Sequence, residues 1–301
     1  MDRLTAMETF ARVIETSSFT AAARQLNMGQ PAVSKAIAQL ERQLGTRLLM
    51  RSTRRLMPTE AGQNYYERAR RAIEEAHEAE LAARGASGGL VGRLRVSAGV
   101  TFGRIHLVPM IPKFLAAHPS LSIDLELDDR TIDLIEGGID VGFRLGPLSE
   151  SSLTARKLIT RRRLVLAARS YFEYASVPIT PTDLLRHPAV IYTRDAGGSD
   201  IWSFRRGPSE MQVNLTGRLR VSAAEGVRAA VLGGMGITVT PQWLFAPELA
   251  SGCVRTVLTD WSLPPSDVWA VLPTGRLVTA KARAFVSFVE KQLQKDCQQI
   301  E

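Results

Sequence analysis

The chain has 301 residues, of which 45% are hydrophobic and 23% charged, and its formal net charge is +8 at pH 7. This length favours two or three folding units, and this composition excludes disordered and collagen-like proteins. No apolar run is long enough to span a membrane, and the N-terminus lacks the apolar core of a signal peptide, so we expect a cytoplasmic protein. The basic excess favours a polyanionic partner, whereas Cys253 and Cys297 lie too far apart to indicate a disulfide framework or a metal site.

The first sixty residues carry the pattern of a helix-turn-helix. Apolar residues recur at helical spacing over residues 4–14, serines precede a second helix over 20–26, and residues 27–29 form a tight turn. Pro31 then stands in the first turn of a third helix, where its missing N–H costs nothing, and the apolar stripe of that helix ends at Gly45. The opposite face carries small and polar side chains that suit a DNA major groove, namely Gln30, Ser34, Lys35 and Ala38.

A basic segment follows the third helix. Residues 42–55 contain five basic residues and no acidic one, and two short strands near 47–51 and 55–57 predict a wing. Phosphate contacts suit the arginines of this wing, whereas contacts with base edges suit the polar face of the third helix. On this pattern alone, an ordinary helical bundle with a solvated basic loop is the alternative.

Residues 10–62 resemble the DNA-binding domain of LysR-type transcriptional regulators. The resemblance rests on Ser-Phe-Thr-Ala-Ala-Ala, on Gln-Pro-Ala-Val-Ser, on Leu-Glu-x-x-Leu-Gly, and on Arg-Ser-Thr-Arg leading into Thr-Glu-Ala-Gly. Gly29 and Leu49 replace the family's usual Ser or Thr and Phe; both are acceptable there, although Gly29 offers no capping hydrogen bond. The resemblance implies a winged helix-turn-helix domain over residues 1–58. Its candidate DNA-contacting residues are Ser18, Thr20, Gln30, Pro31, Ser34, Lys35, Arg51, Thr53, Arg54 and Arg55.

Residues 59–84 contain no proline and predict one long linker helix. Small and apolar residues at heptad-like spacing form a seam on it, consisting of Tyr66, Ala69, Ile73 and Ala76. We expect a dimer to bury this seam, because the family dimerises through such a helix; a helix lying on its own domain is the alternative. Residues 85–92, rich in glycine, then predict a flexible hinge.

From residue 93 onward, strand-like and helix-like segments alternate, which predicts an α/β effector-binding domain with a mostly parallel sheet. The first series has strands at 94–97, 121–127 and 139–144 and helices at 102–117 and 132–136. The second has strands at 164–168, 189–192, 219–222 and 237–240 and helices at 182–185 and 224–233. A strand at 268–272 and a helix at 279–293 are expected to return to the first lobe. The result resembles periplasmic solute-binding proteins, with lobe I at about 93–163 and 267–301 and lobe II at about 164–266.

Ligands of open α/β sheets gather at the carboxyl ends of strands, which places a site in the cleft between the lobes. Backbone N–H groups, arginines and aromatic rings at such ends suit a small organic acid. The candidate effector-binding residues are Val100, Thr101, Arg130, Thr131, Arg144, Tyr192, Trp202, Ser222 and Pro241. The alternative is that each arginine pairs with a surface carboxylate and each aromatic ring belongs to a core.

An arginine run, two adjacent aspartates and the histidines do not indicate a catalytic or metal site. The arginine run at 161–163 predicts a solvated strand edge at the first crossover between lobes, with effector or DNA contact as the alternative. Asp128 and Asp129 are adjacent on a strand and therefore point to opposite faces, which makes them a poor catalytic pair. The histidines show no ligand spacing, and no nucleophile elbow, phosphate loop or dinucleotide fingerprint appears, so neither a metal nor a cofactor is expected.

The resemblance to LysR-type regulators implies a function. We expect a transcriptional regulator that binds double-stranded promoter DNA as a homotetramer, a dimer of dimers, and that responds to a small organic effector. RNA polymerase is a further expected partner, whereas neither catalysis nor membrane association is expected. The sequence also leaves open two hypotheses of other classes: a cytosolic α/β enzyme with a fused DNA-binding head, and a solute-binding receptor. The basic head and the missing export signal argue against the receptor.

Overall fold

The computed structural model describes residues 2–51, 56–83, 89–148, 154–193, 200–273 and 278–298. The chain divides into two compact units, Met1–Arg93 and Leu94–Glu301. Within the described ranges, no helix combines the length and the apolar character that crossing a membrane requires.

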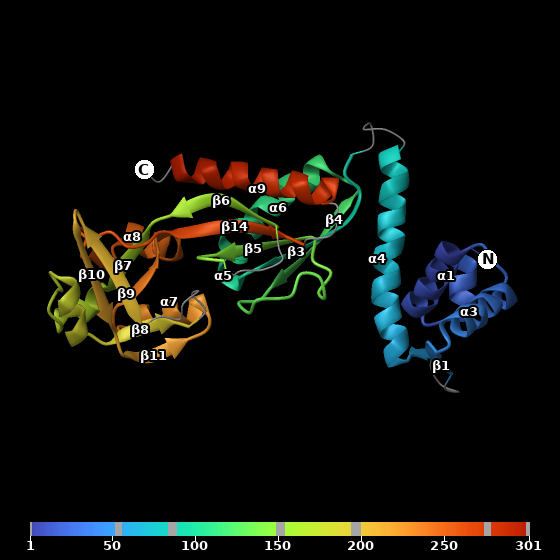
Figure 1. Ribbon diagram of the computed structural model, residues 1–301, viewed down its shortest axis with the longest axis horizontal. Coiled ribbons are helices and arrows are strands. Elements are labelled where there is room, and N and C mark those ends of the chain that lie inside the picture. Colours follow the sequence, from blue (N-terminus) through green and yellow to red (C-terminus); the bar gives the residue numbers. More distant parts are fainter. Residues whose placement is uncertain are drawn as a thin grey trace. The chain divides into compact units, whose positions relative to one another are not determined.

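The first unit is a helical head with a short hairpin and one long helix (Figure 1). Its elements are α1 (Arg3–Thr16), α2 (Phe19–Gln25), α3 (Gln30–Leu44), β1 (Leu49–Arg51), β2 (Leu56–Pro58) and α4 (Glu60–Ala83). The Ser18 hydroxyl caps α2 by accepting from the Ala21 N–H at 3.2 Å. Gly29 begins α3 without a side-chain hydrogen bond, and Gly45 ends it in the left-handed region at φ 67°.

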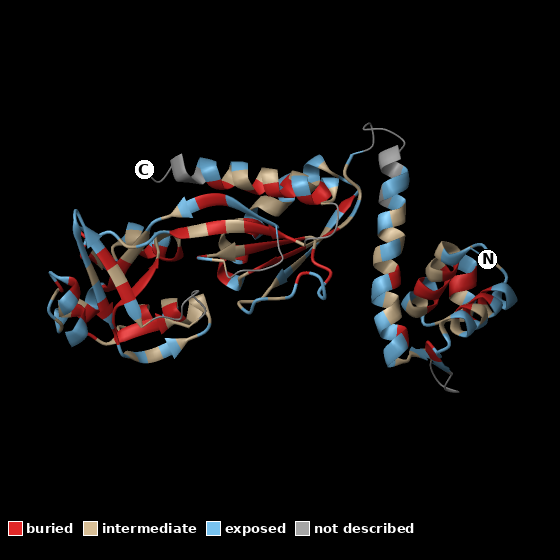
Figure 2. Cartoon of the chain, viewed as in Figure 1, coloured by how far each residue is buried: buried red, intermediate tan, exposed pale blue. Residues whose placement is uncertain are grey.

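The head has its own hydrophobic core, because the apolar stripes of its helices face one another (Figure 2). Phe10 at its centre is 0% exposed, and its ring meets the Tyr65 ring of α4 edge-on, with centroids 5.5 Å apart. The other buried members are Ala6, Val13, Ala22, Ala23, Val33, Ile37, Leu40, Leu48 and Leu49. The first turns of α4 therefore belong to the head, because they pack on its core.

The predicted dimer seam is partly used within the chain. Ala69 is 1% exposed on its own head, and Tyr66 packs against the core while its hydroxyl donates to Glu15 of α1 at 3.3 Å. Ile73 and Ala76 are only half-buried. For Ala69 the expectation of a free seam is therefore wrong, because this face of α4 packs against α1 of the same chain.

The second unit begins with a five-stranded sheet in the order β4-β3-β5-β14-β6. The strands are β3 (Gly92–Ala98), β4 (Leu121–Leu127), β5 (Val141–Leu145), β6 (Thr154–Arg161) and β14 (Ser266–Leu272). β3 and β5 are parallel, but β14 runs antiparallel to both β5 and β6. The sheet is thus mixed, because β14 returns from the second lobe and inserts between two strands of the first.

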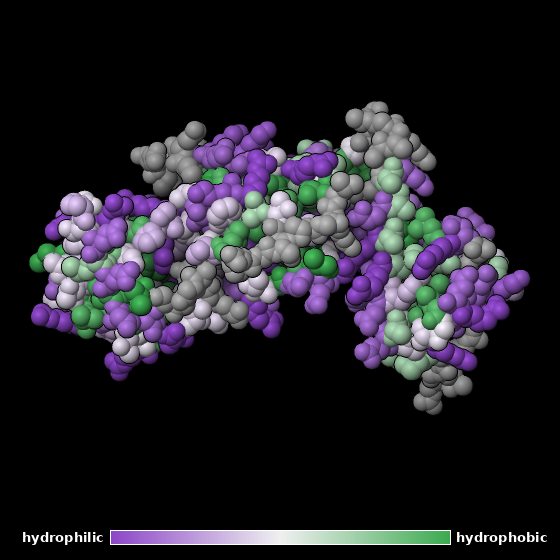
Figure 3. Space-filling model, viewed as in Figure 1, coloured by the Kyte–Doolittle hydropathy of each residue, from purple (hydrophilic) through white to green (hydrophobic). Residues whose placement is uncertain are grey.

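Helices cover this first-lobe sheet. One helical run combines α5 (Val100–Phe102), a π turn (Gly103–Leu107) and α6 (Val108–Ala117), and α9 (Ala280–Gln298) packs against α6 and β6. The outward face of α9 is largely hydrophilic in the space-filling view (Figure 3). The helix expected at 132–136 does not form: the Asp133 carboxylate accepts from the N–H groups of Ile135 and Glu136, and the segment closes as a turn.

The second lobe contains shorter sheets. Its strands are β7 (Arg163–Ala168), β8 (Ala189–Tyr192), β9 (Ile201–Arg206), β10 (Ser209–Asn214), β11 (Gly217–Val221), β12 (Thr238–Pro241) and β13 (Val254–Val257). β12 and β13 flank β7 antiparallel, β11 pairs with β8 parallel, and a parallel bridge from Ala189 to Ile237 connects the two groups. The helices are α7 (Ala224–Leu232), α8 (Ala246–Ser251) and three short 3-10 turns at Arg169–Glu173, Pro181–Arg186 and Gln242–Phe245.

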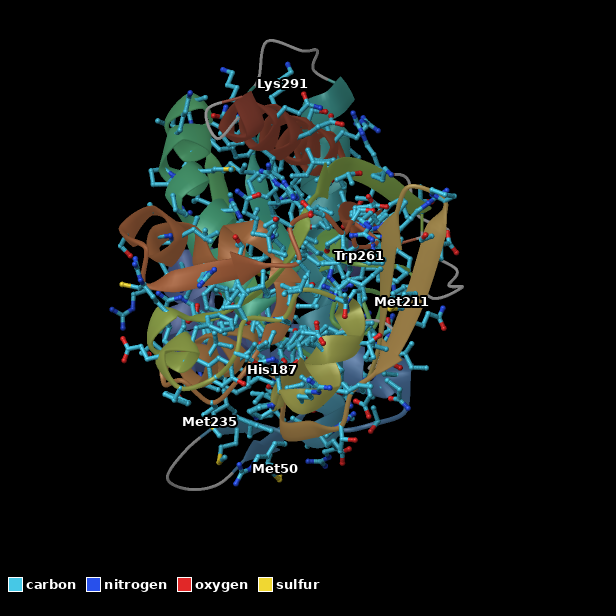
Figure 4. All side chains as sticks on the ribbon, turned by 90° about the vertical axis from the view of Figure 1, so that its left-hand side faces the viewer. Met50, His187, Met211, Met235, Trp261 and Lys291 are labelled. Carbon is cyan, nitrogen blue, oxygen red and sulfur yellow. The ribbon has the colours of Figure 1, made fainter. Side chains whose placement is uncertain are left out.

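The β9–β10 hairpin was not expected from the sequence. Its register pairs Trp202 with Val213 and Phe204 with Met211, so these side chains fall on one face. That face packs into a core that includes Trp261. Figure 4 shows Trp261 beside the hairpin to which Met211 belongs. Met235, in contrast, is 48% exposed and points away from the lobe. β6, β13 and α8 were not predicted from the sequence either.

The arginine run at 161–163 lies where the chain passes from β6 to β7, between the lobes. Arg162 is exposed and its two neighbours are half-buried. The Arg161 guanidinium donates to the Leu293 carbonyl of α9 at 3.3 Å. The run therefore belongs to the crossover, and one of its members helps to hold α9 on the first lobe.

Candidate functional site

The exposed face of α3 carries most of the residues expected to read DNA. Burial of Val33, Ile37 and Leu40 fixes the orientation of the helix, so that its opposite face is left free. Gln30, Pro31, Lys35 and Ala38 are exposed there, and Ser34 is half-buried. Thr20 is exposed on α2, where Ser18 serves as the cap. The Arg51 side chain and residues 52–55, with Thr53, Arg54 and Arg55, lie outside the described part of the chain.

Two residues that the sequence did not single out hold the wing on α3. The Glu41 carboxylate accepts from the N–H groups of Leu48 at 2.8 Å and Leu49 at 3.1 Å. The Thr59 hydroxyl donates to the Arg47 carbonyl at 2.8 Å and accepts from the Gly62 N–H at 2.9 Å. α3, the wing and the start of α4 are therefore joined by hydrogen bonds. Both residues stand in motifs that carry the resemblance, Glu41 in Leu-Glu-x-x-Leu-Gly and Thr59 in Thr-Glu-Ala-Gly.

A cavity of about 80 Å³ lies between the two lobes of the second unit. It is lined by Gly99, Thr101, Phe102, Asp129, Leu145, Tyr192, Ala224, Val227, Val239, Thr240, Pro241, Trp243, Leu244 and Ser266. Three of the expected residues, Thr101, Tyr192 and Pro241, are among them. Thr101 is 2% exposed, and its hydroxyl finds no hydrogen-bond partner in the described part of the chain.

The other expected effector residues are not in the lining of this cavity. The Val100 N–H, expected to bind a ligand anion, donates to the Asp129 carboxylate at 2.9 Å. Arg130 is 73% exposed and pairs with Asp128 at 2.9 Å, and Thr131 and Ser222 are exposed. Trp202 is 8% exposed within the second-lobe core. Strand ends alone did not reveal which side chains turn toward the cleft.

Arg144 is committed to the first lobe. Its guanidinium donates to the Ser97 hydroxyl at 3.2 Å and to the carbonyls of Phe143 at 3.2 Å and Ile132 at 3.3 Å. Burial lowers the pKa of the Arg144 guanidinium below its ordinary value. These bonds connect the turn that follows Ile132 to the ends of β3 and β5, so the role of Arg144 is structural.

An aromatic cluster spans the lobes beside the cavity. Phe102 and His106 of the first lobe pack with centroids 5.1 Å apart, and both meet Trp243 of the second lobe, at 6.1 Å and 5.2 Å. An ion pair between Arg104 and Glu225 also crosses between the lobes, and Glu225 lies 3.8 Å from Arg228. The contacts that cross between the lobes could not be predicted from the sequence, because the residues that they join lie more than a hundred positions apart.

Protonation of His106 is expected to destabilise the second unit. Burial, followed by the charge of Arg161, lowers the pKa of His106 from 6.5 to about 4. Between these two values the unfolded chain binds more protons than the folded one, so the free energy of unfolding falls as the pH decreases from 6.5 to 4, by roughly 3 kcal/mol. Thermal unfolding across this range measures the slope.

The control for this prediction removes the titrating ring without removing an aromatic one. His106→Phe is expected to unfold with a shallower pH dependence than the unchanged chain. Burial also lowers the pKa of His187, which adds to the slope of every variant. Equal slopes in the unchanged chain and His106→Phe would contradict the prediction.

The described residues include no group of three or more histidine, cysteine, aspartate or glutamate side chains that could hold a metal ion. Cys253 is exposed and forms no disulfide, and the side chain of Cys297 is outside the description.

Two family profiles match the chain. One is described as bacterial regulatory helix-turn-helix protein, lysR family, and covers residues 4–63; the other is described as LysR substrate binding domain and covers residues 87–294. An HTH-type transcriptional regulator of Xanthomonas campestris pv. campestris (strain 8004) is 35% identical over 95% of this chain and 84% of its own length. PtxR, an HTH-type transcriptional regulator of Pseudomonas aeruginosa, is 31% identical over 95% and 92%.

Solved structures resemble the chain over nearly its full length. CrgA, a LysR-type transcriptional regulator from Neisseria meningitidis, has 29% identity and a TM-score of 0.61, covering 96% of this chain and 98% of its own. Full-length AphB, a virulence activator of Vibrio cholerae, has 27% identity and a TM-score of 0.57 over the same shares. The similarity thus includes the head, the linker helix and both lobes.

Proposed function

The chain belongs to the LysR family of transcriptional regulators, and from that premise we propose that α3 reads promoter DNA while a small ligand between the lobes controls the binding. The relatives are named regulators, so the chain is a transcriptional regulator and not an enzyme. The observation that carries the proposal is the free polar face of α3, held on a buried core. We place the protein in the cytoplasm, where promoters and RNA polymerase, a further proposed partner, are found.

DNA recognition divides into positioning and reading. Gln30 and Ser34, near the N-terminus of α3, suit contacts with base edges in the major groove, as recognition helices make them. Lys35 and the wing arginines Arg51, Arg54 and Arg55 suit contacts with phosphates, which fix the register and make binding dependent on salt. Thr20, Pro31 and Thr53 complete the proposed surface.

Protection of the protein's own upstream intergenic DNA tests this proposal. We expect Gln30→Ala to weaken binding of the protected site by roughly 1 to 3 kcal/mol, with little effect on non-specific DNA. Gln43→Ala makes the same change at the other end of α3, which enters no groove in this docking, and should leave the affinity unchanged. Equal affinities for both variants, or no protected site at all, would refute the proposed reading face.

Control by a ligand requires two arrangements of the regulator. A ligand between the lobes can shift DNA binding only by favouring one arrangement, with differential affinity. A cavity lies at the carboxyl ends of β3, β8 and β12, which supports the cleft between the lobes as the effector site, with Thr101, Tyr192 and Pro241 as contacts. The proposed ligand is a small molecule; no cofactor is invoked.

We further propose a dimer, and in the cell a homotetramer, because two recognition helices spaced one DNA turn apart read a two-fold site. Ile73 lines a groove between α1 and α4 with Ala11, Leu26 and the charged residues around them. Ile73→Glu is expected to give monomers by light scattering, since it adds a charge to the apolar floor of this groove. Ala72→Glu, on the exposed side of α4, is the matched control, and dimers in both variants would move the interface elsewhere.

A further inference from the structure

The charge of the cavity between the lobes differs from what an anionic ligand needs. Of the 14 described residues that line it, one is charged, and that residue is an acid, Asp129. The others are apolar or aromatic, carry hydroxyl groups, or are glycine. Carboxylate ligands are normally met by arginine, lysine or free N–H groups, so the small organic acid expected from the sequence fits this lining poorly.

The helix end that would bind an anion is already occupied by the protein itself. The helical run begins at Val100, and the Val100 N–H donates to Asp129 Oδ1 at 2.9 Å. Gly99 allows this approach, since a Cβ there would lie 3.2 Å from the same oxygen. The Asp129 carboxylate therefore stands where a ligand carboxylate would stand, and the two negative charges would repel each other.

No described lysine or arginine forms an ion pair with Asp129. The nearest basic residue in sequence, Arg130, turns to Asp128 and contacts it with two of its nitrogens, at 3.0 and 2.9 Å. Asp129 accepts one backbone hydrogen bond with Oδ1, which leaves further lone pairs of the carboxylate for a donor. A half-buried carboxylate in this position favours a cationic partner.

The remaining walls suit the body of such a partner. Phe102, Tyr192 and Trp243 supply aromatic rings, whose faces attract ammonium groups. The volume of about 80 Å³ is far below that of a pocket for a drug-sized ligand, which is roughly 300 to 1,000 Å³. The ligand must therefore be small.

We propose that the effector of this regulator is a small primary or secondary amine, cationic at neutral pH. Its ammonium group pairs with Asp129, and its apolar body packs among Phe102, Tyr192 and Trp243. This inference rests on the proposed function, because it takes the cavity between the lobes as the effector site. It replaces the organic acid expected from the sequence.

Three probes of one shape and different charge test the proposal on the full chain: isobutylamine, isobutanol and isobutyrate. We expect ligand-observed NMR to show tighter binding of isobutylamine than of either other probe. Asp129→Asn should weaken isobutylamine by about tenfold or more and leave isobutanol nearly unchanged. Asparagine keeps an oxygen for the Val100 N–H, so the helix cap survives. Asp128→Asn, the same change one residue away, is the control and should not affect the amine.

Tighter binding of isobutyrate, equal amine affinity in Asp129→Asn, or no binding of isobutylamine would each overturn the proposal. The affinity for the protected upstream DNA, measured with and without each probe, separates it from the proposed function. An amine that binds through Asp129 without changing the DNA affinity would support the ligand class and refute the role of the cavity in control. A carboxylate that binds and changes the DNA affinity would support that role and refute the amine.

Discussion

Phe10→Ala is expected to unfold the head and abolish DNA binding while the second unit stays folded. Phe10 is 0% exposed and joins α1 to α4 through the Tyr65 ring. Removing a buried phenyl ring costs roughly 3 to 5 kcal/mol, through lost transfer free energy and the cavity left behind. Small domains have only about 5 to 15 kcal/mol of stability in total, so the head loses much of its own.

Differential scanning calorimetry of the full chain measures this effect. The two units have separate cores, so we expect the transition of the head to fall sharply and that of the second unit to remain. Phe10→Leu is the matched variant: it keeps most of the buried volume and should lower the head transition much less. Unchanged DNA binding by Phe10→Ala would show that α3 is held in place without this core.

Gly236→Ala is expected to disrupt the second lobe and ligand binding while leaving the head intact. Gly236 has a φ of +147°, and a Cβ there would lie 2.0 Å from the Pro188 carbonyl oxygen. That oxygen accepts from the Ile237 N–H at 2.9 Å, and the Ile237 carbonyl accepts from Val190. Moving the chain to relieve the clash breaks these bonds between β8 and β12, at a cost of roughly 3 kcal/mol or more.

The consequence reaches the cavity because Tyr192 on β8 and Thr240 and Pro241 on β12 line it. Gly207→Ala is the control: its φ of +56° is also left-handed, but a Cβ there meets nothing within 4 Å. In this variant the free energy of unfolding should fall only by the cost of a left-handed backbone for a residue with a Cβ, about 1 to 2 kcal/mol. A second-unit transition that falls equally in the two variants, measured by calorimetry, would contradict the clash argument.

The head was predictable in detail because its signals are local. Helix spacing, the serine before α2, Pro31 at the start of α3 and Gly45 at its end all act within a few residues. Such short-range preferences can be read directly from the sequence. The exposed face of α3 followed from the same periodicity.

Which distant element packs on an apolar helix face could not be predicted from such local signals. The seam on α4 has the spacing that a dimer needs, but α1 of the same chain covers Ala69. Periodicity shows that a face is apolar and does not say which element will bury it. Likewise, Trp202 and Trp243 both stand near strand ends, and only the packing of the β9–β10 hairpin sends Trp202 into the core.

Local sequence patterns were sufficient to predict the helix-turn-helix head, the long linker helix and the alternation of strands and helices in two lobes, because these depend on spacings within single elements. Which side chains meet between the lobes, in contrast, depends on long-range packing. The lining of the cavity comes from segments as far apart as Gly99 and Ser266, brought together when β14 returns to the first sheet. The position of Asp129 on the Val100 N–H, and with it the charge of the cavity, arises from the pairing of β4 with β3 in the sheet, which no local pattern encodes.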